Sequence, residues 1–117
     1  MTTDRPQAFF RLIQSDSLTR QGFMSHEALG IPPRRPLSRR EQDLWHGVSV
    51  HDSLEAACAK GSVSPWLGRY VAEIRIPPGT VVRIEQTGRD RSHYTIWASA
   101  DDLLSWVVSV TRVEPVH

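Results

Sequence analysis

The sequence predicts an α+β fold in which a small, mainly antiparallel and split β-sheet carries two or three short helices. The chain has 117 residues, the size of one domain. Candidate strands and helices alternate in the first half and consecutive strands follow in the second, an order typical of α+β proteins. The segment RYVAEIRI (69–76) alternates apolar and polar residues, as an antiparallel strand with one solvated face does.

Six segments have the composition or the period-2 pattern of strands. They are 9–15, 44–50, 69–76, 80–86, 92–97 and 106–113. We expect the last of these, which is rich in β-branched residues, to be a central strand. Helices are expected between the strands, where serine or aspartate can cap a first turn. They are 18–29, a helix from the Asp52–Glu55 capping box to Gly61, and a short one around Leu103 and Leu104 that Ser99 and Asp102 can cap.

A segment rich in proline and arginine, IPPRRPLSRR (31–40), interrupts the first half of the chain. Proline fixes φ and lacks a backbone donor, so we expect a surface loop there. Residues 1–7 are polar and include a proline, which predicts a loose N-terminal arm. Residues 8–117 are then expected to form a single domain that carries the loop.

Composition excludes several classes of protein. No apolar run approaches the roughly 18 residues of a membrane span, and no signal peptide opens the chain. A single cysteine, Cys58, excludes an internal disulfide and fits a reducing compartment, so we expect a cytoplasmic protein. Without an H-E-x-x-H or paired-cysteine motif we expect no metal. The net charge of +1 gives no general argument for nucleic-acid binding.

Arginine is nevertheless concentrated, since 13 of the 14 basic residues are Arg, whose planar fork suits phosphate and carboxylate. Arg11 is flanked by Phe9 and Ile13 on one face of its strand. An unpaired charge in such surroundings is expensive, so Arg11 is expected to meet a carboxylate, a carbonyl or an anionic ligand. For a carboxylate, Glu73 and Glu85 are the candidates.

Two further segments combine polar groups that could hold a ligand. LWHGVS (44–49) contains His46, Gly47 and Ser49, followed by His51, and glycine lets a ligand approach the backbone closely. SHYTIW (92–97) contains aromatic residues that can stack on a flat ring. The alternative for both segments is an ordinary core strand.

With the opening FFRLI strand and the G-x-S strand that runs into a short helix, these segments resemble the ADP-ribosyltransferase fold. The resemblance implies binding of NAD and transfer of ADP-ribose to a macromolecular target. In the placement we prefer, Arg11 is the first-strand cation, Ser49 the second-strand hydroxyl and Glu85 the acid. His46, Gly47, His51, Tyr94 and Trp97 would then contact the cofactor. In a second placement, His46 is the first-motif histidine, and Tyr70 or Tyr94 stacks.

The late glutamate departs from the family pattern, because Glu85 does not lie in an E-x-E or Q-x-E context. A second hypothesis is therefore a non-catalytic interaction module, such as an immunity, antitoxin or phage accessory protein. Its arginine-rich loop would grip an acidic protein partner through four side chains: Arg34, Arg35, Arg39 and Arg40. A third hypothesis, a small RNA-binding protein, rests on the same arginines and on the exposed aromatic residues.

Overall fold

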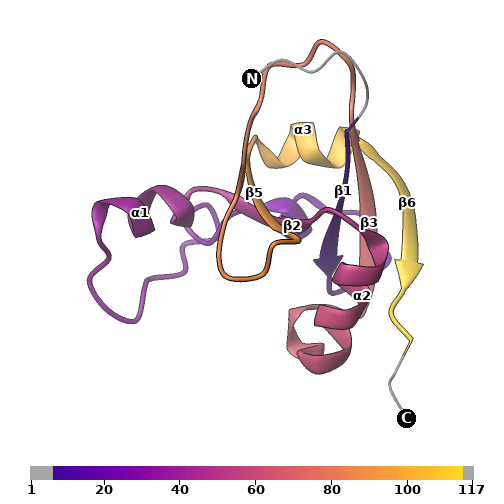
Figure 1. The fold of residues 1–117 in the computed structure, drawn as a ribbon, viewed down its shortest axis with the longest axis horizontal. Helices are drawn as coiled ribbons and strands as arrows, with labels where there is room; N and C mark the ends of the chain where they lie inside the picture. The colour runs from indigo at the N-terminus through magenta and orange to yellow at the C-terminus, as the bar shows by residue number, and fades with distance from the viewer. Residues whose placement is uncertain (1–6, 115–117) are drawn as a thin grey trace.

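The computed structural model describes residues 7–114 and shows one six-stranded sheet flanked by short helices (Figure 1). The strands are β1 (Gln7–Ile13), β2 (Val48–His51), β3 (Tyr70–Ile76), β4 (Arg83–Gln86), β5 (His93–Trp97) and β6 (Val107–Arg112). The helices are α1 (Arg39–Trp45), α2 (Leu54–Val63) and α3 (Ala100–Ser105), with 3₁₀ turns η1 (Arg20–Phe23) and η2 (Pro65–Leu67).

All neighbouring strands are antiparallel, in the order β4-β5-β2-β1-β3-β6. The α+β class with an antiparallel sheet is thus confirmed. The sheet is continuous rather than split. The expectation that 106–113 forms a central strand is wrong, because β6 pairs only with β3 and lies at an edge. Its β-branched residues favour extended backbone but do not distinguish an edge from a centre.

Apolar side chains on one face of the sheet form the main core beneath α3 and η1. Phe9, Val50 and Ile96 come from three strands, and Phe23 and Leu103 come from η1 and α3. On the other face α2 packs against β1 and β3 through a smaller cluster that includes Ala57 and Val71. Figure 1 shows that α1 and the loop before it extend to one side of the sheet.

Two element predictions in the first half are wrong. The helix predicted over 18–29 is reduced to η1 followed by turns, and only Phe23 of η1 is buried. The strand predicted over 44–50 begins at Val48 instead, because Leu44 and Trp45 end α1. A capping box between Ser38 and Glu41 starts α1, so the last residues of the predicted loop 31–40 are helical or cap the helix.

The helix predicted to stop at Gly61 continues to Val63. Gly61 is buried against β1, where a Cβ would lie 2.9 Å from Leu12 Cδ2, so the missing side chain lets α2 pack closely. The predicted N-terminal arm lies outside the described residues except for Gln7, which begins β1. Within residues 7–114, no helix is long and apolar enough to cross a lipid bilayer.

Gly68 joins η2 to β3 with φ 155°, and a Cβ there would lie 2.5 Å from the Ile13 carbonyl oxygen. We predict that Gly68→Ala destabilises the protein by about 3 kcal/mol or more, since backbone strain and a backbone clash add. Gly79 also has positive φ but has open space around it. Gly79→Ala should therefore cost only about 1 kcal/mol. Urea unfolding of both variants measures the difference, and equal losses would contradict the clash.

Candidate functional site

A cavity of about 590 Å³ lies where β1 and β2 separate. β1 pairs with β3 along its whole length but with β2 only at Phe10 and His51. Arg11 and Leu12 on one strand, and Val48 and Ser49 on the other, line the cavity beyond that pair. The other lining residues come from the segment 24–31, from Leu44 of α1, from Gly47 and His51, from β5, from the end of α2 and from η2.

The guanidinium of Arg11 spans the gap between the two strands. Its Nη1 donates to the Ser49 carbonyl and its Nε to the Gly22 carbonyl, both at 2.7 Å. Neither Glu73 nor Glu85 is its partner, so the ion-pair alternative is not realised. Burial lowers the pKa of Arg11 to about 10, and the side chain is still charged at neutral pH.

Two charged basic side chains, Arg11 and Lys60, and three histidines, His26, His51 and His93, line the cavity together with apolar residues. Among the residues that line it within 7–114, none is Asp or Glu. A hollow with cationic walls and no compensating carboxylate attracts anions, because the low-dielectric walls focus the field.

Hydroxyl groups and one exposed aromatic ring complete the lining. Ser25, Ser49 and Ser64 are polar members of the wall. Trp66 of η2 lines the cavity although 74% of its surface is exposed. An indole that is this exposed beside a cationic hollow is available to stack on a flat ligand ring.

Two histidines face each other in the cavity wall across β2 and β5. The rings of His51 and His93 are edge to face, with centroids 5.6 Å apart. His51 Nδ1 is buried without a hydrogen-bond partner, and burial, with the neighbouring His93 second, lowers the pKa of His51. His93 Nδ1 lies 3.1 Å from the Thr87 carbonyl oxygen and 3.0 Å from Thr87 Oγ1.

Of the residues that the sequence predicted for the site, the structure brings four to this cavity: Arg11, Gly47, Ser49 and His51. Ser49 contacts Arg11 through its carbonyl oxygen, not through its hydroxyl. Gly47 is required by packing as well, since a Cβ there would lie 2.2 Å from Thr95 Cγ2.

Three other predicted cofactor contacts do not line this cavity. His46 Nδ1 pairs with Glu27 at the protein surface. Tyr94 packs against Phe9 on the core face, with ring centroids 5.5 Å apart, as the core alternative predicts. Trp97 donates from Nε1 to the Asp43 carbonyl, and its ring is covered by the Arg83 guanidinium 3.8 Å above the centroid.

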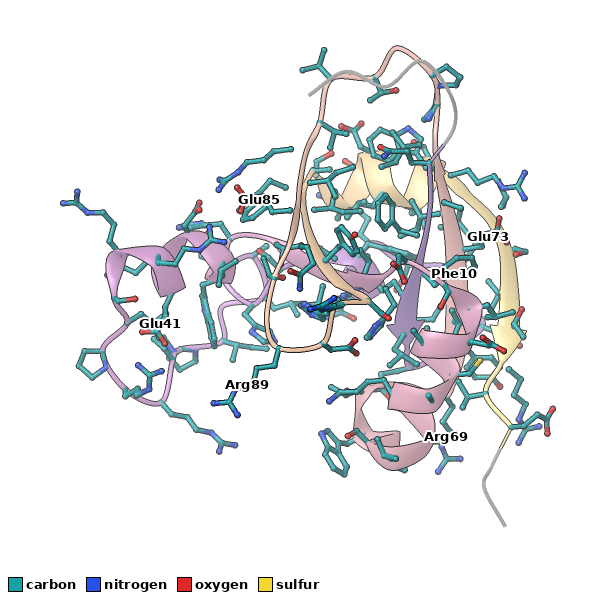
Figure 2. The ribbon with its side chains drawn as sticks, in the orientation of Figure 1. Phe10, Glu41, Arg69, Glu73, Glu85 and Arg89 are labelled. Carbon is teal, nitrogen blue, oxygen red and sulfur yellow. The ribbon has the colours of Figure 1, made fainter. Side chains whose placement is uncertain are left out.

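The predicted acid Glu85 belongs to an ion network between β4 and α1. Arg83 donates 3.0 and 2.7 Å bonds to the two Asp43 oxygens. Arg83 also lies 3.3 Å from Glu85 Oε1, and Arg40 lies 3.1 Å from Glu85 Oε2. Figure 2 shows Glu41 and Glu85 on the side of the sheet that carries α1, away from Phe10 and Glu73. The placement of Glu85 as the acid of this cavity is therefore wrong.

The four loop arginines divide into two pairs. Arg35 is held by Glu41, and Arg40 by Asp43 and Glu85. Arg34 and Arg39 are exposed and have no ion pair with any residue that the structure describes. Only the second pair is free to meet an acidic partner without breaking an internal contact.

Sequence reasoning did not select Lys60, Trp66, His26 or His93 for the site. Lys60 is the one lysine of the chain, and that singularity could have marked it as a candidate. His93 lies in SHYTIW, the segment considered for its aromatic residues. Trp66 has no local sequence signal, because it reaches the cavity only through the packing of α2 on β1.

Comparison of the chain with protein-family models, curated proteins and solved structures finds no match.

We predict that the ion network with Arg40 and Arg83 holds the pKa of Glu85 below its ordinary value. Arg40, and after it Arg83, lowers the pKa of Glu85, so Arg83→Gln should raise it in a ¹³C NMR titration. The pKa of Glu85 is lower in the folded protein than in the unfolded chain. The ion network therefore stabilises the fold at pH values above the unfolded-state pKa, and this stabilisation is lost as the pH falls through the folded-state pKa. Arg75→Gln, whose partner is Glu73, should leave Glu85 unchanged. An unperturbed Glu85 in the parent protein would contradict the network.

Proposed function

We propose that this protein binds NAD or a related nucleotide in the cavity between β1 and β2. The observation that carries the proposal is the charged Arg11, which lines the cavity without a carboxylate partner. A guanidinium has five N–H donors, and the protein uses two of them here. The remaining donors can bind phosphate oxygens.

The lining residues match the parts of a nucleotide. Arg11 and Lys60 suit phosphate groups, Ser49 suits a ribose hydroxyl, and Trp66 suits the flat base. The volume of about 590 Å³ lies within the range of roughly 300–1,000 Å³ typical of small-molecule sites. The resemblance to ADP-ribosyltransferases in FFRLI and LWHGVS points to NAD among the nucleotides that this lining would accept.

Transfer of ADP-ribose to a macromolecular target is the reaction that the same resemblance implies. Glu85 does not line this cavity, so that reaction would require another residue in place of the acid that the resemblance implies.

Isothermal titration calorimetry with NAD tests the proposal. We expect binding by the parent protein and a loss of about 10- to 100-fold in Lys60→Ala, since a hydrogen bond to a charged group is worth about 1.5–3 kcal/mol. Lys60 is exposed, so its removal should spare the fold.

Arg112→Ala is the matched control, because it removes one positive charge from the exposed edge strand β6. It should bind NAD as the parent does. Absence of any heat with NAD, ADP-ribose and AMP would overturn the proposal. An equal loss of NAD affinity in Arg112→Ala would show that the binding is general charge attraction and not a specific site.

The alternative, an interaction module that grips an acidic protein, is favoured by one observation. Arg34 lies in the loop before α1, and Arg39 is the first residue of α1. Both are exposed and have no ion pair with any residue that the structure describes. We predict that the double variant Arg34→Ser/Arg39→Ser weakens binding of a labelled polyglutamate peptide in fluorescence anisotropy. The charge-matched variant Arg89→Ser/Arg112→Ser should not. Equal effects of the two variants would exclude a specific loop site.

A further inference from the structure

We propose that His93 is the catalytic proton acceptor of this cavity, activating a water or hydroxyl nucleophile for attack on bound NAD. This inference rests on the proposed function and adds a residue that the resemblance does not supply. Three features of the structure support it: the orientation of the His93 ring, the surroundings of the other histidines, and the absence of a carboxylate from the described lining.

The contact with Thr87 orients the His93 ring and favours one tautomer. The Thr87 carbonyl, 3.1 Å from Nδ1, can only accept a hydrogen bond, and Thr87 Oγ1, 3.0 Å from the same nitrogen, can accept as well as donate, so the pair of contacts favours the proton on Nδ1. In the neutral ring the lone pair then lies on Nε2, on the edge away from Thr87. Thr87 is itself held, because its Oγ1 lies 2.8 Å from Thr95 Oγ1 in the buried interior. His93 is therefore a preoriented base.

The other histidines near the cavity lack this arrangement. His51 has no partner that fixes its ring, since Nδ1 is buried and unbonded. The ring of His26 lies against Trp45 with centroids 4.5 Å apart, and His46 is paired with Glu27 outside the lining. Of these four histidines, only His93 both lines the cavity and has its Nδ1 held by a carbonyl acceptor, that of Thr87.

The charges around His93 suit the reaction. Lys60 and Arg11 line the same cavity and would hold the pyrophosphate, while His51 is disposed to stay neutral by burial beside His93. In the described lining no carboxylate competes for the proton. A histidine that accepts a proton in the transition state contributes typically 10²- to 10⁴-fold to a rate.

The step balances without a further reactant. The nucleophile's oxygen forms a bond to the anomeric carbon of the nicotinamide ribose, and its proton passes to His93 Nε2. The bond from that carbon to the pyridinium nitrogen breaks, and its electron pair neutralises the ring. Nicotinamide leaves, and with water as nucleophile the other product is ADP-ribose. His93 then releases the proton to solvent.

The experiment compares NAD binding by calorimetry with nicotinamide release by chromatography. In His93→Asn the side-chain amide can still donate to the Thr87 carbonyl, but it offers no lone pair at the Nε2 position. We expect this variant to bind NAD as the parent does and to release nicotinamide at least about 100-fold more slowly. Glu85→Gln should release nicotinamide at the parent rate.

Chemical rescue separates a catalytic from a structural role. In His93→Gly, added imidazole should restore part of the release rate, because it can occupy the vacated space and accept the proton. An inactive His93→Asn without imidazole rescue of His93→Gly would overturn the inference, as would unchanged release in His93→Asn.

The remaining outcomes are also decisive. NAD binding by the parent protein without any nicotinamide release overturns the inference and leaves the proposed function standing. Absence of NAD binding removes both. Loss of release in Glu85→Gln with full activity in His93→Asn would assign the role to the carboxylate instead.

Discussion

The separation of β1 from β2 is the constraint on which the site depends. In a regular antiparallel pair the Ser49 carbonyl would accept a backbone N–H from its neighbouring strand. Here the two strands pair only at Phe10 and His51, and the Arg11 guanidinium takes over the Ser49 carbonyl. The same side chain binds the Gly22 carbonyl and so ties η1 to the sheet. A charged side chain therefore occupies the Ser49 carbonyl at this gap, where a complete ladder would place a backbone donor, and the cavity lies at the same place.

This double role couples stability to binding. Truncating Arg11 would leave the carbonyls of half-buried Gly22 and exposed Ser49 without their side-chain donors, and η1 would lose its tie to the sheet. The burial that lowers the pKa of Arg11 also means that an anion in the cavity would offset a desolvation cost which the folded protein already carries. Binding should then stabilise the fold through the same residue that forms the site, whereas Lys60, which is exposed, affects binding alone.

Sequence patterns predicted best those elements whose residues interact locally. The alternation in 69–76 predicted β3, and the Ser99 cap predicted α3, where Ser99 Oγ accepts from the Asp102 N–H. The boundaries near α1 were missed because the Ser38–Glu41 capping box follows a proline-rich loop that favours extended backbone. The resemblance predicted that Arg11 and Ser49 lie together, and they do, through the Ser49 carbonyl rather than its hydroxyl. Lys60 and Trp66 lie at and after the end of α2, which Gly61 lets pack closely against Leu12, and no local sequence pattern encodes that packing.

The distribution of charge explains why a nearly neutral chain can hold a cationic cavity. The net charge is +1, but Asp43 and Glu85 are bound to Arg40 and Arg83 on the α1 side of the sheet. Those carboxylates form ion pairs in the network whose Arg83 covers Trp97, so they do not neutralise Arg11 and Lys60. Sequence order could not separate the two groups, since Glu85 and His93 lie on adjacent strands joined by one turn. What separates them is the strand on which each lies: Glu85 is on the edge strand β4, beyond β5, and is in register with Thr95, while His93 is on β5 and lies directly opposite His51 of β2.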